Sequence, residues 1–536
     1  MRPDNAAISA APGAHAHRGR ASRTRRSRLL PSATAAGIAA TLAAALLALG
    51  AGGRIAPRPA SAAQTQAPAL PVAVWVHARD RGAPVAQRFL GLSFEVSSLP
   101  QIAEYAQRGD LVTLLRSLGP GILRFGGASA DSRVAWTDQM TPRPAWASSV
   151  LDPADLRRLR TLAQESGWRV MLTLGLAHYE PRAAAREAAA AKAALGPWLA
   201  AIEVGNEPDA YGLHHFRTLP WTYQQYATEL NTYRSAIASA APGIPLAGPD
   251  VSGSRIFEHW ATSEAAGEHP ALLTGHHYPL GCEESPAATI PRLLSTETRR
   301  LENESLARFI TVSRASGLGV RLDETGSVSC GGRPGISNTF ASALWAVDYI
   351  ARAMAAGAAG INLEGNPANC RGYSPLCAPT PAQLAAGALK VQPVWYALLL
   401  TKTLLGDRPL RTSVSSPKRA DVAATALQAP YGGLRVVLVN DDAPGTGTAA
   451  VSLHVGGAGR PASVLVLSAP ALAARSGVEL GGTAVSPAGS WSGPHGRTPA
   501  AMSDGAVSVS VPAASAVLVT VAPARAPHPG TASTQS

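Results

Sequence analysis

Between residues 89 and 406 the chain alternates short apolar runs with longer amphipathic segments. The short runs end in glycine or polar residues, as buried parallel strands do, at Leu90–Phe94, Gly121–Phe125, Arg169–Leu174, Ala201–Gly205, Pro245–Gly248, Leu272–His276, Gly319–Asp323 and Gly360–Leu363. The longer segments have helical spacing, at Asp110–Ser117, Pro153–Ser166, Arg182–Ala194, Tyr223–Ala240, Arg255–Ala266, Leu293–Ser316, Asn338–Ala356 and Val394–Leu405. Eight strand–helix units in about 250–320 residues predict an α/β protein with a (β/α)8 TIM barrel. The alternative is an open doubly wound sheet. It is disfavoured because no glycine-rich phosphate loop follows the first predicted strand.

From about residue 407 the pattern changes to alternating apolar and polar residues around Gly, Pro and Asp turns. This pattern predicts an antiparallel β-sandwich, with strands at Leu434–Val439, Ala449–Val455, Ser463–Leu467, Val507–Val511 and Ala516–Val521. Val72–His77 also reads as a strand, and we expect the segment 72–88 to join that sandwich. The predicted domains are therefore a barrel over 89–406 and a sandwich over 407–523, followed by a disordered tail at 524–536.

The basic character of the chain is concentrated at its beginning. The net charge is +12, but residues 1–62 hold nine Arg and one Asp, so the remainder carries +4. This is too little to predict nucleic-acid binding. The arginines around Arg25-Arg26, an uncharged stretch from Leu29 to Gly53 and the Ala60-Ser61-Ala62 box are typical of a cleaved signal peptide, with some resemblance to a twin-arginine signal. A retained membrane anchor is the alternative. We expect an exported protein with no stable membrane association after cleavage.

Four cysteines follow the leader, at Cys282, Cys330, Cys370 and Cys377. An even number in an exported chain predicts two disulfides. Cys370 and Cys377 lie close together in a loop rich in Gly and Pro, so we pair them, which leaves Cys282 with Cys330. A metal site is disfavoured because no CxxC motif occurs.

Two glutamates stand where a TIM barrel places catalytic groups. Glu207, in "EVGNEPDAYG", follows the fourth predicted strand, and Glu324, in "GVRLDETGS", ends the seventh. Residues at the carboxyl ends of barrel strands line the active-site mouth, and retaining glycosidases need two such carboxyl groups. Glu364, near the end of the eighth strand, is the rival for either role. Asp323 should point away from the site by strand alternation.

Several motifs, in order from about residue 72 to 523, resemble glycoside hydrolase family 79. They are "FLGLSFEVSSL" (89–99), "ILRFGGASAD" (122–131), "EVGNEPDAY" (203–211), "GHHYP" (275–279), "SVSCGG…GISNTFASALWAVDYI" (327–350) and "VQPVWYALLL" (391–400), with "SGVELGG…GSWSG…VSVSVPAASAVLV" (476–519) in the predicted sandwich. That family of clan A retaining enzymes includes β-glucuronidases and heparanases. The resemblance implies a β-glucuronidase acting on a uronic-acid glycan or glycoside, without metal or organic cofactor.

The resemblance also implies residue roles. Glu207 would be the acid/base and Glu324 the nucleophile, whose carboxylate Arg124 and Tyr278 would hold. The implied substrate contacts come from Asn206, Glu95, Asp131, the Ser329–Gly331 loop and Tyr373, with the loop gripping the uronate carboxylate.

The chain departs from the family pattern at three places that bear on the sugar. Glu324 is followed by Thr325-Gly326-Ser327 in place of Ala-Asn-Ser, Ser329 stands where some glucuronidases have tyrosine, and the eighth strand ends in Leu363-Glu364-Gly365 rather than a His-rich turn. An ionised Glu364 would repel a uronate unless it were protonated or paired. A β-glycosidase for xylose or glucose and a non-catalytic carbohydrate-binding protein therefore remain alternatives.

Overall fold

The computed structural model describes residues 69–417, 420–456 and 460–523. The predicted leader at 1–62 and tail at 524–536 lie outside these described residues. Within them, no helix combines the length and the apolar character that crossing a membrane requires.

The first part of the described chain is a parallel eight-stranded barrel, as predicted. Its strands are β2 (Leu90–Glu95), β3 (Ile122–Gly126), β6 (Arg169–Leu174), β7 (Leu199–Val204), β8 (Ala247–Val251), β9 (Leu272–His277), β10 (Val320–Thr325) and β11 (Gly360–Gly365). They pair in the order β7-β6-β3-β2-β11-β10-β9-β8, and a single bridge between Ile202 and Leu246 joins the two ends. The barrel is therefore almost closed, with its seam between β7 and β8.

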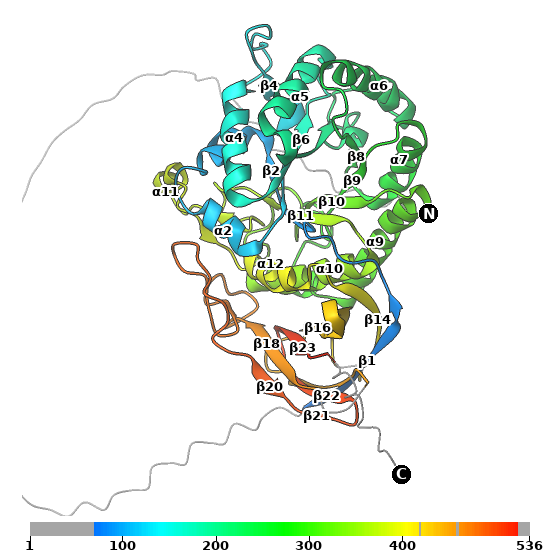
Figure 1. The fold of residues 1–536 in the computed structure, drawn as a ribbon, viewed down its shortest axis with the longest axis vertical. Helices are drawn as coiled ribbons and strands as arrows, with labels where there is room; N and C mark the ends of the chain where they lie inside the picture. The colour runs from blue at the N-terminus through cyan, green and yellow to red at the C-terminus, as the bar shows by residue number, and fades with distance from the viewer. Residues whose placement is uncertain (1–68, 418–419, 457–459, 524–536) are drawn as a thin grey trace, which may run out of the picture. The chain divides into compact units, whose positions relative to one another are not determined.

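Helices surround the barrel, most of them where helical spacing predicted them, whereas the short helices Leu99–Glu104 and Ile290–Leu293 were not predicted (Figure 1). They are α1 (Leu99–Glu104), α2 (Leu111–Leu118), α4 (Pro153–Ser166), α5 (Pro181–Leu195), α6 (Tyr223–Ala240), α7 (Ser254–Gly267), α8 (Ile290–Leu293), α9 (Thr296–Ser316), α10 (Phe340–Ala356) and α12 (Trp395–Thr401). Local signals set several boundaries. Asp152 caps α4 through the backbone N–H groups of Ala154 and Asp155, and Gly167 ends that helix in a left-handed conformation.

Short elements extend the loops at the carboxyl ends of the strands. They are α3 (Ser129–Ser132), β4 (Val134–Trp136) and β5 (Ser149–Leu151) after β3, and β12 (Leu376–Cys377), α11 (Pro381–Ala386) and β13 (Lys390–Val391) after β11. Such loops carry the binding groups of TIM barrels.

The remaining strands form one sheet of eleven strands, so the predicted sandwich is a single curled sheet. Its strands are β1 (Leu70–Arg81), β14 (Arg408–Ser415), β15 (Val422–Gln428), β16 (Leu434–Asn440), β17 (Thr448–His454), β18 (Ala462–Ser468), β19 (Glu479–Leu480), β20 (Thr498–Ala500), β21 (Met502–Ser503), β22 (Ala506–Pro512) and β23 (Ser515–Val521). As predicted, the segment before the barrel belongs to this sheet: β1 pairs antiparallel with β14 and parallel with β17.

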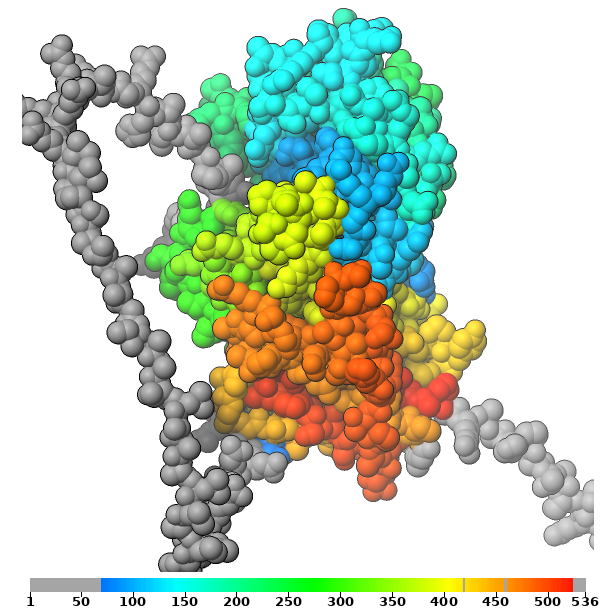
Figure 2. Space-filling view, turned by 90° about the vertical axis from the view of Figure 1, so that its left-hand side faces the viewer, coloured from blue at the N-terminus to red at the C-terminus, as the bar shows by residue number. Residues whose placement is uncertain are grey.

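Strand β16 is buried on both faces, which shows how the sheet packs. Val436 and Leu438 belong to the core inside the curled sheet, whereas Val437 and Val439 belong to the same hydrophobic cluster as the barrel helices. Helix α10 supplies the barrel side of this contact, and Arg299 on α9 adds an ion pair of 2.6 Å to Asp421. In Figure 2 the segment around α11 also meets the loop 475–487 of the sheet domain.

Candidate active site

Glu207 lies just beyond the end of β7, in an uncommon backbone conformation. Its φ is 46°, in the left-handed region that side chains rarely adopt, and its N–H donates to the carbonyl of Asp250 at 2.9 Å. Asp250, on the neighbouring strand β8, is also left-handed, with φ 58°. Strained positions of this kind cluster at functional sites, where the surrounding structure holds them.

Glu324 lies near the end of β10 and faces Glu207 across the barrel mouth. A carboxylate oxygen of each residue and a ring nitrogen of His276 all lie within 4.8 Å of one another. In retaining glycosidases the two carboxyl groups are about 5–5.5 Å apart, whereas inverting enzymes separate them by about 6.5–9.5 Å to admit a water. An approach this close is compatible with the shorter spacing of a retaining pair.

The carboxylate of Glu324 is held from both sides. Nη1 of Arg124 donates to Oε2 at 2.9 Å, and the hydroxyl of Tyr278 donates to Oε1 at 2.8 Å. Burial raises the pKa of Glu324, but the charges of His276 and Arg124 and the Tyr278 hydrogen bond outweigh it and bring the pKa below its ordinary value. Glu324 is thus kept ionised, as a nucleophile must be.

Arg124 is the centre of a buried network of charges. Its side chain is fully buried and contacts Glu203 at 3.0 Å, Asp250 at 2.8 Å and Asp323 at 3.1 Å, in addition to Glu324. Burial opposes the charge on the guanidinium, yet the surrounding carboxylates raise the pKa of Arg124 well above its ordinary value. Truncating such a group would leave buried carboxylates without a counter-charge.

His276, at the end of β9, connects the two facing glutamates, Glu207 and Glu324, to this network. Its Nδ1 lies 2.9 Å from Oε1 of Glu207, and its Nε2 lies 2.8 Å from Oδ1 of Asp250. Burial lowers the pKa of His276, but Glu324 and Asp250 raise it well above the ordinary value. The ring is therefore charged, and each nitrogen donates to a carboxyl oxygen.

Asp323 was predicted to point the other way from Glu324, into the packing or a supporting layer; it does lie in buried packing, but inside the barrel beside Glu324. Asp323 is fully buried inside the barrel, with Oδ2 3.1 Å from Nε of Arg124. The pairing of β10 with β9 shifts register between Leu322 and Glu324, and a β-bulge of this kind lets consecutive side chains share a face. Burial and the charge of Glu203 raise the pKa of Asp323 well above its ordinary value.

Asn206 and Asp131 are neighbours with different surroundings. The amide oxygen of Asn206 accepts from Nη2 of Arg124 at 2.9 Å, which leaves its NH₂ group as a donor. Asp131 is buried and accepts three backbone N–H groups, from Leu176, Ala177 and Asn206, at 2.7, 3.0 and 2.8 Å. Its geometry is that of a residue which positions the backbone of Asn206, rather than the sugar contact that the resemblance implied.

Two more carboxyl groups, Glu95 and Glu364, lie on the β2 and β11 side of the pair. Glu95 accepts from the backbone N–H of Ser129 at 2.8 Å. Burial raises the pKa of Glu95, and burial together with the charge of Glu324 raises that of Glu364 well above its ordinary value. These surroundings favour the neutral form of Glu364 and the ionised form of Glu324.

Both predicted disulfides are present, and they brace the loops beside Glu324. Cys282 is bonded to Cys330, and Cys370 to Cys377. Between them, Ser329 accepts from the N–H of Cys282 at 3.1 Å. Gly331, in the same loop, has φ 85°, a left-handed conformation that glycine adopts without steric cost.

Tyr373 crosses from the loop after β11 and stacks on Tyr278, with ring centroids 5.9 Å apart. A Cβ on Gly326 would lie 2.9 Å from the Tyr373 ring and 3.1 Å from the Tyr278 ring. Glycine after Thr325 thus allows the two tyrosines to approach. Arg124, Tyr278 and Tyr373, which were predicted to lie around Glu324, are therefore close together in the structure.

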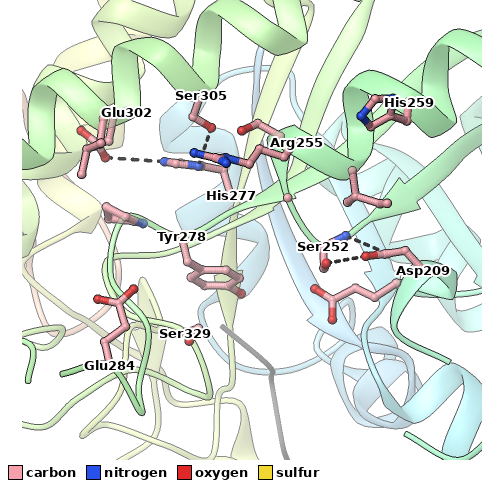
Figure 3. Close-up of a pocket in the computed structure, with 16 residues that line it drawn as sticks. Asp209, Ser252, Arg255, His259, His277, Tyr278, Glu284, Glu302, Ser305 and Ser329 are labelled. Atoms are coloured by element: carbon pink, nitrogen blue, oxygen red, sulfur yellow. Dashed lines mark hydrogen bonds and ion pairs between the residues drawn. The ribbon is translucent and has the colours of Figure 1, made fainter. Parts of the chain in front are cut away.

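A cleft of about 610 Å³ opens on the Glu207 side of the pair (Figure 3). It runs between the start of α7, which presents Arg255 and His259, and the face of α9 that carries Ser305. Asp209 borders it and accepts from the hydroxyl of Ser252 at 2.6 Å. The cleft is lined by Glu207, and Tyr278 and Ser329 also border it, so it adjoins the paired glutamates.

Two sets of side chains have the spacing of metal ligands: Glu207, His276 and Glu324, and Asp250, His276 and Asp323. Both share a charged imidazolium, which cannot coordinate a metal, and the guanidinium of Arg124 already contacts Glu324, Asp250 and Asp323. The positive charge that a metal would supply is therefore provided by Arg124 and His276, and the residues fit no metal.

Asp250 and His276 are the site residues that the sequence interpretation missed. The fifth strand was predicted to end at Gly248, but β8 continues through Pro249 to Val251. Proline is tolerated there because β8 lies at the seam of the barrel. His276 ends the sixth predicted strand, a position that marks a candidate site residue in a barrel.

The site lies at the mouth of a parallel eight-stranded barrel joined to a β domain, with Glu207 and Glu324 facing each other. Residues 424–518 match the family model described as Glycosyl hydrolase family 79 C-terminal beta domain. A curated β-glucuronidase of Aspergillus niger (strain ATCC MYA-4892 / CBS 513.88 / FGSC A1513) is 30% identical over 186 residues, which cover 30% of this chain and 33% of that protein. The chain thus aligns with about a third of that relative's length.

Solved structures share the fold over most of the chain. A 4-O-α-L-rhamnosyl-β-D-glucuronidase from Fusarium oxysporum 12S is similar with a TM-score of 0.67 and 20% identity, covering 85% of this chain and 99% of that one. A family 51 arabinofuranosidase from Xanthomonas axonopodis pv. citri has a TM-score of 0.59 and 17% identity, with 84% and 100% covered. The family-model match and the curated relative support the resemblance to glycoside hydrolase family 79, and the solved structures show that the fold is shared.

Proposed function

We propose that the protein is a retaining β-glycoside hydrolase of the β-glucuronidase type, acting on glycans or glycosides that contain glucuronic acid. The observation that carries the proposal is the pair Glu207 and Glu324, whose oxygens lie within 4.8 Å at the ends of β7 and β10. The spacing suits a covalent intermediate and leaves too little room for the water of an inverting enzyme.

In the first step Glu324 attacks the anomeric carbon while Glu207 gives its proton to the departing oxygen. Arg124 and Tyr278 keep the attacking carboxylate ionised and aimed. His276 donates to Oε1 of Glu207, so Oε2 is the oxygen that carries the proton toward the leaving group in the adjoining cleft. Protonation of a poor leaving group contributes about 10²–10⁴-fold to such rates.

In the second step Glu207 takes a proton from a water molecule, which attacks the glycosyl ester and releases Glu324. Two displacements return the original anomeric configuration. Around the sugar, we propose that the NH₂ group of Asn206 binds the 2-hydroxyl. Tyr373, Glu95 and the Ser329–Gly331 backbone complete the subsite.

Turnover of nitrophenyl β-glucuronide, compared with the β-xyloside and β-glucoside, tests the sugar. The account predicts preference for the glucuronide, and preference for a neutral glycoside would favour the second candidate, a clan A β-xylosidase or β-glucosidase. The observation that favours this neutral-sugar candidate is Ser329, which stands where some glucuronidases have a tyrosine.

We also propose that the protein is exported. The structure pairs all four cysteines in disulfides, and such bonds persist in oxidising compartments. Detection of the protein in culture medium with residues 1–62 removed would support export, and retention in the cytosol with free thiols would contradict it.

A further inference from the structure

Glu364 is a buried carboxyl group that the mechanism does not use. It lies near the end of β11, is 4% exposed, and pairs in register with Ser93 of β2. The hydroxyl of Ser93 accepts from Arg124, so this register position faces the barrel interior beside the charged network. Asn362, two residues earlier, also faces inward, whereas Leu363 packs in the outer core.

One oxygen of Glu364 has no partner. Oε2 is buried without a hydrogen bond, while the side chain meets Ser93 on its other side. Buried polar atoms are nearly always satisfied, and an unsatisfied one costs about 1–3 kcal/mol. An orphaned polar atom at the end of a barrel strand, next to the nucleophile, is a position that a ligand would satisfy.

The groups facing Glu364 come from five segments. They are Glu95 on β2, Arg124 on β3, Tyr278 after β9, Glu324 on β10 and Tyr373 after β11. Glu324 among them is an anion. Burial raises the pKa of Glu364, and the charges of Glu324 and Glu95 raise it further. A carboxyl group in such surroundings stays neutral and offers an O–H donor, which an ionised carboxylate cannot do.

We propose that Glu364 binds the sugar as a neutral hydrogen-bond donor through Oε2, and that the site accepts an anionic sugar only while this carboxyl group is protonated. The inference rests on the proposed uronate specificity and deepens it. It resolves the conflict between a glutamate on β11 and a negatively charged substrate, since the proton that removes the repulsion also supplies the donor. When Glu364 loses that proton, it becomes an anion beside the uronate and at the same time ceases to be a hydrogen-bond donor.

The variant Glu364→Gln tests this directly, because glutamine has the same shape and remains a neutral donor at every pH. KM for nitrophenyl β-glucuronide is measured for the wild type and the variant from pH 5 to pH 9. The ratio of the two KM values removes the effects of other titrating groups. The wild-type KM divided by the KM of Glu364→Gln should stay within about threefold of one at low pH. Once Glu364 ionises, this ratio should rise by about tenfold per pH unit.

Two controls separate charge from shape. Glu187→Gln, on α5, removes another buried carboxyl group whose pKa is raised by burial to about 8, and it should leave the KM profile unchanged. Glu364→Leu lacks the donor and should raise KM at all pH values, with folding verified by its melting curve. For a neutral glycoside the ratio of wild type to Glu364→Gln should not vary with pH.

A ratio for the glucuronide that is the same at every pH, in an enzyme that turns it over, would overturn the role of Glu364 and leave the proposed function intact. Absence of glucuronide turnover, with turnover of a neutral glycoside, would overturn the uronate assignment and this inference with it.

Discussion

The guanidinium of Arg124 donates a hydrogen bond of 2.9 Å to Oε2 of Glu324, joining the proposed nucleophile to a fully buried charge network. The contact links the stability of the barrel to its chemistry, because the same guanidinium also contacts the buried carboxyl groups of Glu203, Asp250 and Asp323. Catalytic geometry and core electrostatics therefore depend on one side chain.

Arg124→Met should both destabilise and inactivate the protein. Removing one partner of a buried ion pair costs roughly 3–5 kcal/mol, because the remaining charges are left uncompensated. Urea unfolding measures the loss, and Arg116→Met is the matched control. Arg116 pairs with Glu165 on the surface at 2.9 Å, an interaction of roughly 0–1 kcal/mol. Equal losses for the two variants would contradict the network's importance.

Glu207→Ala should impair substrates according to their leaving groups. Glycosides with poor leaving groups should lose about 10²–10⁴-fold in rate, whereas activated aryl glycosides still form the intermediate. Azide should then restore turnover of the activated substrate and give a β-glycosyl azide.

The companion variant Glu324→Ala should give the α-glycosyl azide, since azide then attacks the sugar directly. Equal damage to poor and activated leaving groups in Glu207→Ala would show that Glu207 is not the acid.

His276 should stabilise the protein in a pH-dependent way. An unfolded histidine has a pKa of about 6.5, and the folded pKa of His276 is raised well above its ordinary value by Glu324 and Asp250, against the effect of burial. The stabilisation is therefore fully present below about pH 6.5 and is lost as pH rises through the folded value.

His276→Gln should accordingly show its largest deficit in the free energy of unfolding near pH 5.5, with a smaller deficit at higher pH. His495→Gln, at an exposed position in the β domain, is the control and should show none. A deficit for His276→Gln that does not change with pH would mean that the ring is neutral in the folded protein.

The cleft beside Glu207 should hold the leaving group. His259 lines it from an exposed position on α7, so His259→Trp should narrow it without disturbing the core. KM for a disaccharide should rise about tenfold, with little change for a small nitrophenyl glycoside. Thr262→Trp, exposed on the same helix but outside the cleft, should affect neither substrate. If His259→Trp left the disaccharide KM unchanged, the leaving group would lie elsewhere.

The sequence predicted the barrel well because hydrophobic spacing is set by burial, which the barrel imposes on every strand. Glu207 and Glu324 followed from the rule that strand ends carry the chemistry. Asp323 was misplaced because a β-bulge breaks the two-residue period, and no local residue pattern marks the bulge. Asp250 was missed because the fifth predicted strand ended at Gly248, whereas β8 runs through Pro249, which a strand at the seam tolerates.

Other features depended on long-range contacts that spacing cannot give. Strand β14 (Arg408–Ser415) was missed because its residues are mostly polar or exposed, and its place follows from pairing with β1, more than 300 residues earlier in the chain. Likewise, the backbone contacts of Asp131 join β6 and β7 loops that the sequence does not show to be adjacent.

The identity of the nucleophile is the central claim, and covalent labelling tests it most directly. A fluoro-glucuronide or a cyclophellitol-type uronate should label the protein once, and peptide mass spectrometry should place the label on Glu324. Glu324→Gln should abolish labelling and nearly all turnover, a loss that approaches about 10⁶-fold, because an amide cannot attack. A label on Glu364, or a product of inverted configuration, would contradict the account.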